Sequence, residues 1–559
     1  MKARSAPPWM RLSNMKRQEA PLIGAAALKK GLRFVLFPSL ALLVAAPLGA
    51  AFLPLFRSPG ALSNLSAALG DPRFLASFGF GLGQAFASSL LALLIGLPGA
   101  FFLAKRSFPG KRFLGALSAV PFCVPPLIVA IGFVLYYGRQ GYLNRALMAM
   151  FGLEAPPLDF LYSFKGVVLA HAFYNFPLVM RLVGDAWANA SRAQEEAAEL
   201  LGASRLRVFL TISLPGLLPA IGSALSLVFL LCFYSFVLVL LFGGPGVGTP
   251  EVELYRAARF DFNKGLAAAF ALVESAVAFI VLAIYARLER SIAGQRGDAA
   301  ARARPAAFKS PAEKAAALAY GLFIALFFLG PLFCVALESL VVKSGRFGAG
   351  LLGLANYAAL FSSASFGRAA LNTLALGLAS AALAAALGFA FSIALKNCPS
   401  AFLSSVLPMA PLAVSSVVLA YGWSELLGGS SVLAIAAVQA VSAYPFILRS
   451  IQGSIGLSDE RYAQAALTLG SSRLGAALKI RLPLALPALL SGFAFAFAIS
   501  AGDANALIVA PVRGFDTLAL LLYRLAGSYR FNEACAAAVI LGLATALVFF
   551  LKDARDAVA

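Results

Sequence analysis

The sequence carries EEAAELLGASRLRVFLTISLP at residues 195–215 and AQAALTLGSSRLGAALKIRLP at residues 463–483. Both stretches have Glu or Gln before two alanines, then three residues and a glycine, nine residues and an isoleucine, and a closing Leu-Pro after one more residue. Corresponding positions are 268 residues apart throughout, so the stretches are copies of one unit. The repeat therefore predicts a chain built from two matching halves.

Each copy predicts a helix, a break and a second short helix. In the first copy, helix-forming residues precede Gly202, which can adopt the left-handed conformation that ends a helix. Ser204 can then cap the second helix, and Pro215 fits the first turn of the next one. The second copy repeats these features at Gly470, Ser472 and Pro483. The expected product is a two-helix elbow; a plain helical connector is the alternative, which two copies with identical spacing disfavour.

The composition excludes a soluble protein. Of 559 residues, 61% are hydrophobic and 12% are charged, whereas soluble domains carry about 25% charged residues. The net charge of +21 does not indicate nucleic acid, because no basic stripe is interleaved with aromatic residues. The five cysteines form no CxxC pair and His171 is the only histidine, so no disulfide framework and no metal site is predicted.

Twelve apolar stretches are long enough to cross about 30 Å of hydrocarbon as helices. The sequence thus predicts an all-α polytopic membrane protein with six spans in each half. The first six stretches are Val35–Phe56, Phe78–Leu103, Phe113–Tyr137, Gly166–Val183, Leu217–Leu241 and Leu266–Tyr285. The other six are Ala317–Val341, Ala370–Leu395, Ser404–Leu426, Ser431–Leu448, Leu486–Ala510 and Glu533–Leu551.

The polar segments indicate the orientation and the division of the chain. With the N-terminus inside, 31 of 45 Lys and Arg residues fall on the inner side, so both termini are predicted to be cytoplasmic. The expected parts are a tail (1–34), a first half (35–285), a polar linker (286–315) and a second half (316–559).

The duplication extends beyond the elbows. HAFYNFPLVMRLV at 171–183 matches QAVSAYPFILRSI at 439–451 with the same offset of 268, and LPGAFFLAKRSFPG at 97–110 resembles LGFAFSIALKNCPS at 387–400 with an offset of 290. The difference of 22 residues fits a longer outer loop at 139–165. Duplicated membrane halves commonly form a substrate path at their interface, although duplication without transport is the alternative.

Polar groups at membrane depth are candidates for this path, because they are costly there. Asp503 and Asn505 lie in the eleventh span, and the repeat places Ser235 opposite Asp503. We predict that these residues line the path, where a carboxylate would attract a cation. Tyr234 is a further candidate and, like Trp423, could stack on an aromatic cation. The alternative for Asp503 is a hydrogen-bonded kink.

For the other polar residues within the membrane, the sequence favours structural roles over transport. His171 and its counterpart Gln439 are predicted to hydrogen-bond between helices. For the acids Glu274, Glu338 and Glu425, a hydrogen bond to a structural partner such as Ser275 or Ser339 explains the residue at least as well as a role in transport. Arg181 and Arg449 are predicted to anchor the cytoplasmic ends of their helices.

With its two elbows, the sequence resembles the membrane permease subunits of binding-protein-dependent ABC importers, in which this frame is called the EAA loop. Because both halves carry it, the chain resembles a fused permease of the ferric iron and thiamine type. The segments LCFYSFVLVLLFGGPG (231–246) and EVELYRAARFDFNKGLAAA (251–269) are most similar to the thiamine branch. One departure is Gln464, which stands where the family usually has Glu, so the second elbow is expected to make a weaker polar contact.

The resemblance implies that each elbow docks onto one of two cytoplasmic ABC ATPase subunits. The residues implied in docking are Glu196, Ala197, Ala198, Gly202, Ile212, Pro215, Gln464, Ala465, Ala466, Gly470, Ile480 and Pro483. The chain has no Gly-x4-Gly-Lys-Ser/Thr phosphate loop. We therefore expect no catalytic residues and no cofactor bound by this chain, with ATP and Mg²⁺ on the partner.

The resemblance also implies a setting and a cargo. The expected location is the bacterial inner membrane, among lipids, with a periplasmic or lipid-anchored solute-binding protein as second partner. Thiamine is the first choice of cargo, followed by ferric iron and other small solutes. A gradient-driven twelve-span carrier is the alternative of another class, but it leaves the paired elbows unexplained. An intramembrane enzyme lacks a catalytic constellation.

Overall fold

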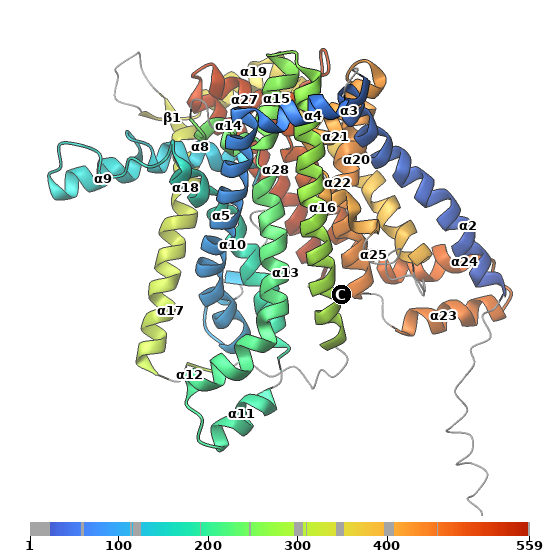
Figure 1. The fold of residues 1–559 in the computed structure, drawn as a ribbon. Helices are drawn as coiled ribbons and strands as arrows, with labels where there is room; N and C mark the ends of the chain where they lie inside the picture. Colours follow the sequence, from blue (N-terminus) through green and yellow to red (C-terminus); the bar gives the residue numbers. More distant parts are fainter. Residues whose placement is uncertain are drawn as a thin grey trace, which may run out of the picture.

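The protein is a bundle of long helices in the computed structural model (Figure 1). The predicted tail up to residue 22 and linker residues 296–305 and 309 lie outside the described residues. The described residues are 23–57, 61–111, 114–115, 124–190, 192–244, 248–295, 306–308, 310–342, 351–395, 407–454 and 457–556.

The first half consists of helices, two of which contain a π-helical turn. Its elements are α2 (Ile23–Leu40), η1 (Ala41–Ala45), α3 (Ala46–Arg57), α4 (Ala61–Gly70), α5 (Pro72–Lys105), α8 (Pro126–Tyr137), α9 (Tyr142–Phe151), α10 (Phe164–Ala188), α11 (Arg192–Leu200), α12 (Arg205–Val208), η2 (Phe209–Ser213), α13 (Leu214–Phe233), α14 (Val237–Phe242), α15 (Pro250–Arg259) and α16 (Lys264–Gln295).

The second half repeats this order and adds one short antiparallel β pair. Its elements are α17 (Pro311–Ile324), η4 (Ala325–Leu329), α18 (Gly330–Leu340), β1 (Val341–Val342), β2 (Leu351–Leu352), α19 (Ala355–Ser362), α20 (Ala364–Leu395), η6 (Leu407–Ala413), α21 (Ser416–Leu427), α22 (Val432–Ser454), α23 (Leu457–Thr468), α24 (Arg473–Ala476), η7 (Ala477–Arg481), α25 (Leu482–Gly502), α26 (Asn505–Val509), α27 (Leu518–Gly527) and α28 (Phe531–Asp556).

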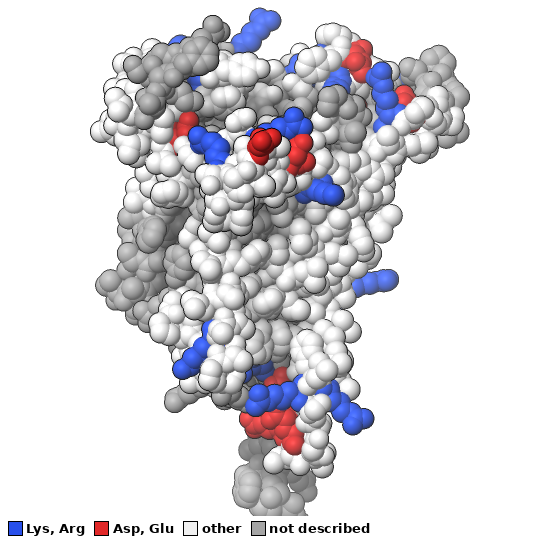
Figure 2. All heavy atoms as spheres, turned by 90° about the vertical axis from the view of Figure 1, so that its left-hand side faces the viewer, with Lys and Arg blue, Asp and Glu red and all other residues white. Residues whose placement is uncertain are grey.

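The all-α membrane fold is confirmed. Among the described residues, ten helices are long and apolar enough to cross a membrane, and each matches a predicted span. Helices suit this environment because lipid offers no partner to backbone polar groups. Figure 2 shows a largely uncharged belt between two ends where Lys, Arg, Asp and Glu gather, as expected for a protein that spans a bilayer.

The third and ninth predicted spans are the exceptions. Ser404–Leu426 was expected to be one helix, but η6 and α21 are bent by 93° at a break. Ser415 stands at this break and caps α21, so the chain turns where one continuous helix was predicted. For Phe113–Tyr137, the continuous helix α8 starts only at Pro126, and residues 116–123 are outside the described part.

The first helix of each half packs on the other half. α2 and α3 lie against α20 and α21, and α18 lies against α8. The contact is tight: a Cβ at Gly422 of α21 would come within 2.0 Å of the Pro47 carbonyl oxygen in α3. On the other side, the rings of Phe173 and Phe328 stack at 4.6 Å. The two halves are therefore interlocked.

Helix packing corrects the repeat register of one segment. Gly96 of α5 lies against Val179 of α10, and Gly388 of α20 lies against Ile447 of α22. Val179 and Ile447 are 268 residues apart, as the repeat requires. Gly96 and Gly388 therefore occupy corresponding positions, and the offset of this segment is 292 residues instead of the predicted 290. Glycine marks the closest approach of two helices and fixes the register more strictly than a letter match does.

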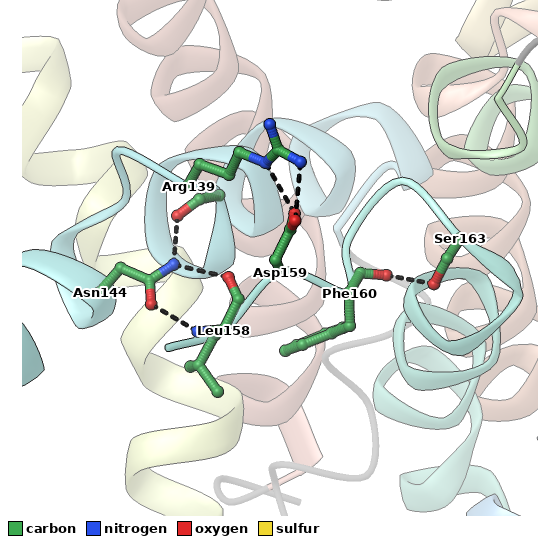
Figure 3. A network of polar contacts seen from close by, with 7 residues as sticks. Arg139, Asn144, Leu158, Asp159, Phe160 and Ser163 are labelled. Atoms are coloured by element: carbon green, nitrogen blue, oxygen red, sulfur yellow. Dashed lines mark hydrogen bonds and ion pairs between the residues drawn. The ribbon is translucent and has the colours of Figure 1, made fainter. Parts of the chain in front are cut away.

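The extra residues of the first half form a loop that includes α9, between α8 and α10. Figure 3 shows its polar network: Asn144 donates to the Leu158 carbonyl and accepts from the Leu158 N–H, at 2.8 and 2.9 Å. Arg139 forms two hydrogen bonds of 2.7 Å with Asp159 and lowers the pKa of that carboxyl. The predicted longer loop is therefore present and ordered by its own contacts.

Candidate functional site

The two elbows have the predicted local geometry. In the first, α11 ends before Gly202, which has φ +87°, and α12 follows. In the second, α23 ends before Gly470, which has φ +86°, and α24 follows. Only glycine adopts these angles without strain. The predicted helix, break and helix are confirmed in both copies.

Capping and proline placement also agree with the expectation. The Ser204 hydroxyl accepts from the Arg207 N–H at 3.4 Å, and Ser472 accepts from the Gly475 N–H at 3.0 Å. Each elbow then passes through a π-helical turn into the next long helix, whose first turn contains Pro215 in α13 and Pro483 in α25.

The elbows present matching surfaces. Glu196 and Gln464 are exposed at corresponding positions. Leu201 and Leu469, also 268 residues apart, are 89% and 88% exposed. The other residues implied in docking lie on the same elbows: Ala197, Ala465, Gly202, Gly470, Pro215 and Pro483 are exposed, and Ala198, Ala466, Ile212 and Ile480 are half-buried. Large exposed leucines on a polar elbow indicate a surface that a partner covers.

Both elbows lie at one end of the bundle. Figure 1 shows α11 and α12 at the bottom and α23 and α24 at the right, below the middle, whereas α9, α15, α19 and α27 lie in the upper part. The two elbows are therefore exposed on the same side of the bundle.

One anchor of the first elbow was missed by sequence reasoning. The Lys105 ammonium forms an ion pair of 2.8 Å with Glu195, and the Ser213 hydroxyl donates to the same carboxylate at 2.8 Å. In the second elbow the counterpart of Glu195 is the buried Ala463. No spacing rule links Lys105 to Glu195, because their contact depends on how α5 ends beside α11.

A cavity of about 290 Å³ lies between the halves. All four residues predicted for the path contribute to its wall: Tyr234, Ser235, Asp503 and Asn505. Trp423, the second aromatic considered, is not among its lining residues.

Matching polar clusters from the two halves face this cavity. His171 Nε2 lies 2.6 Å from Ser235 Oγ, and its Nδ1 lies 3.5 Å from Ser88 Oγ. At the equivalent place Gln439 Nε2 donates to Asp503 at 3.4 Å, and Gln439 Oε1 accepts from Ser380 at 3.1 Å. The interhelical hydrogen bonds predicted for His171 and Gln439 are confirmed.

Asp503 lies both at a hydrogen-bonded helix break and in the cavity wall. It follows the last residue of α25, and its Oδ1 accepts from the Asn505 N–H at 2.9 Å at the start of α26. It also lines the cavity, as the one acidic residue there, and no Lys or Arg belongs to the described lining. The Asp503 side chain thus caps the start of α26 at the helix break and is also the only acidic group of the described cavity wall.

Other acids serve as structural contacts. Glu338 accepts from the Tyr142 hydroxyl at 2.7 Å and from Asn532 at 3.1 Å, which gives it structural partners, as suggested. Glu425 forms an ion pair of 2.9 Å with Lys264.

A duplicated helical membrane shell, with a cavity between the halves and matched elbows at one end, defines a membrane permease. Residues 96–294 and 373–555 match the binding-protein-dependent transport system inner membrane component family. The chain belongs to this family and is an inner-membrane permease of the ABC importer type, with two fused permease domains. The predicted resemblance is confirmed.

Individual relatives share most of this organisation. The chain is 30% identical over 486 residues to the thiamine transport system permease protein ThiP of Brucella abortus (strain 2308), which covers 85% of this chain and 86% of that protein. It is 28% identical to ThiP of Haemophilus influenzae, covering 89% and 94%. The putative 2-aminoethylphosphonate transport system permease protein PhnU of Salmonella typhi is 35% identical over 38% of this chain and 74% of that protein.

Proposed function

We propose that this permease moves a small organic cation, with thiamine as first candidate, into the cytoplasm at the expense of ATP. One observation carries the choice of charge: Asp503 is the single acidic residue of the described cavity lining, which includes no Lys or Arg. A carboxylate in a low-dielectric wall attracts cations and repels anions. The two ThiP relatives support thiamine. Ferric iron is the second candidate.

The same charge argument disfavours a phosphonate. PhnU is named for 2-aminoethylphosphonate and matches only part of the chain. A phosphonate group carries negative charge, and the described lining offers it no basic side chain. Asp503 would repel it.

The elbows supply the proposed contact with the energy source. Each would rest on one of two copies of a cytoplasmic ABC ATPase, which binds ATP and Mg²⁺, and the permease itself would take no cofactor. Gln464 offers an amide where Glu196 offers a carboxylate, so the second contact would be the weaker one. Both termini would be cytoplasmic, and a periplasmic or lipid-anchored binding protein would deliver cargo at the opposite end.

The chain connects the elbows directly to the cavity. The first elbow continues into α13, which ends at Phe233 beside Tyr234 and Ser235 of the wall. The second continues into α25, which ends at Gly502 beside Asp503. If ATP brings the two elbows together, both cavity walls would move with them. Such a shift requires ATP to bind one conformation more tightly than the other.

Reconstitution tests this proposal. The permease, its ATPase and its binding protein are placed in lipid vesicles, and uptake of labelled thiamine is measured with and without ATP. The expected result is uptake that needs ATP and the binding protein, with none of 2-aminoethylphosphonate. Uptake on a proton or sodium gradient without ATP would instead favour a gradient-driven carrier.

A further inference from the structure

Two buried carboxyls lie behind the wall of the central cavity. Glu251 in α15 and Glu274 in α16 are 1% and 0% exposed. The Glu251 carboxyl lies against the Glu274 carboxyl and the Ser415 hydroxyl. Among the described residues, none of the four carboxyl oxygens has a hydrogen-bond partner apart from the opposite carboxyl and the Ser415 hydroxyl. The pair is therefore a buried acidic group with no partner of opposite charge.

The pair is connected to the cavity through its wall. Tyr234 and Ser415 line the cavity. The Tyr234 hydroxyl is buried, has no hydrogen-bond partner among the residues that the structure describes, and interacts electrostatically with both glutamates. Glu251 also interacts with Asp503. A charge that enters the cavity beside Tyr234 and Asp503 will therefore be felt by the pair, since the low dielectric of the interior screens it weakly.

In the described part of the chain, no basic side chain compensates the pair. The titratable groups that interact with the pair are Tyr234 and Asp503, and two further tyrosines, Tyr255 and Tyr421, lie on α15 and on α21, which packs against it. The other charged residues on α15, α16 and the helices packed against them do not serve either. Arg57 and Arg287 are exposed. The remaining ones have partners of their own: Arg73 with Asp261, Lys105 with Glu195, Glu253 with Arg256, Arg259 with the Val509 carbonyl, Lys264 with Glu425, and Glu289 with Arg449.

Two adjacent carboxylates without a counter-charge cannot both stay ionised where water is excluded. We propose that Glu251 and Glu274 share a proton while the cavity holds no cation, and release it to bulk water when a cationic solute enters. One carboxylic acid becomes a carboxylate, and the charge of the solute replaces that of the proton. This inference rests on the proposed function, because it requires a cationic cargo.

The exchange links binding to pH. If one proton leaves for each cation bound, the affinity rises by up to about tenfold per pH unit in the range where the pair titrates. The direction follows from mass action. At low pH, protons compete with the solute for the pair, and at high pH the pair has already lost its proton before the solute binds.

The test uses the full chain in lipid nanodiscs and two readouts. Binding of labelled thiamine is measured over a pH series, and an infrared difference spectrum is recorded on adding thiamine. The protonated-carboxyl band should fall while carboxylate bands rise. The double variant Glu251→Gln/Glu274→Gln should lose both the band change and the added pH slope, whatever titration thiamine itself shows. Glu425→Gln, which removes a carboxyl paired with Lys264 elsewhere, should keep both.

The outcomes separate this inference from the cargo assignment. Thiamine that binds without changing the carboxyl bands of the unaltered protein would overturn the proton pair and leave the proposed cargo intact. If choline gives the band change and thiamine does not bind, the pair is supported and the thiamine assignment fails. No band change at saturating concentrations of either cation would overturn the inference.

Discussion

Arg449 of α22 forms an ion pair with Glu289 of α16, with 2.8 Å between Nη2 and Oε2, and so joins the second half to the first. The guanidinium also lies 4.9 Å from the centre of the Tyr285 ring. Its repeat counterpart Arg181 is exposed. The halves are therefore alike in fold but joined unequally, and the anchoring role predicted for Arg449 takes the form of a bridge between them.

Arg449→Ala should weaken this joint moderately. Both partners are about one-third exposed, so the ion pair contributes about 1 kcal/mol or less, and the ring contact a similar amount. We expect the free energy of unfolding in detergent to fall by about 1–2 kcal/mol. Arg181→Ala, the matched change in the first half, should shift it by about 0.5 kcal/mol or less. Equal losses would show that Arg449 contributes nothing as a bridge.

Leu201→Asp combined with Leu469→Asp should prevent assembly with the ATPase. The substitution puts a charge into each surface that the partner is proposed to cover, and it leaves unchanged the glycines Gly202 and Gly470, whose left-handed conformation ends the helices. Co-purification of the ATPase should be lost, while the melting temperature of the permease alone is unchanged. Leu351→Asp, an exposed leucine of β2 at the other end, is the control and should leave assembly intact.

Asp503→Asn should weaken cargo binding without disturbing the fold. An amide oxygen can still accept the hydrogen bond from the Asn505 N–H, but the negative charge of the wall is gone. Thiamine affinity should drop at least about tenfold, the usual scale for one lost charge-assisted contact. Asp516→Asn, which breaks a pair with Arg524 outside the cavity, serves as control. Unchanged affinity would remove Asp503 from the path.

Glu195→Ala should loosen the first elbow from α5. The loss of two contacts to a mostly buried carboxylate leaves Lys105 without its partner and should cost about 2 kcal/mol. Because the elbow then moves without α5, we also expect less thiamine transported per ATP hydrolysed. Glu199→Ala, on the exposed side of α11, should change neither quantity. A normal transport ratio in Glu195→Ala would show that this anchor does not transmit motion.

Local chemistry explains what the sequence predicts well. The elbows depend on residue types with strong conformational preferences, such as Gly202 and Ser204, and the spans depend on apolar length alone. The correspondence of Ser235 with Asp503 follows from the 268-residue offset, and both residues line the cavity. Two copies of each feature reinforced predictions that one copy would have left open.

Contacts between distant elements were beyond sequence reasoning. The break at Ser415 lies inside an apolar run that was predicted as one span from its length, although Pro408 and Pro411 stand just before the break. The 292-residue offset at Gly96 depends on helix packing, and the neighbouring positions of Glu251 and Glu274 depend on how α15 folds back onto α16. Composition and spacing carry no information about such pairings.

The central claim is that both elbows lie on the cytoplasmic face and dock one ATPase assembly. The most direct test places a single cysteine at Leu201 or Leu469 in a chain whose native cysteines are replaced, and measures labelling by a membrane-impermeant maleimide. Both positions should react in inverted vesicles but not in intact cells, and bound ATPase should protect both. Labelling of either position from outside, or labelling that the ATPase leaves unchanged, would contradict the account.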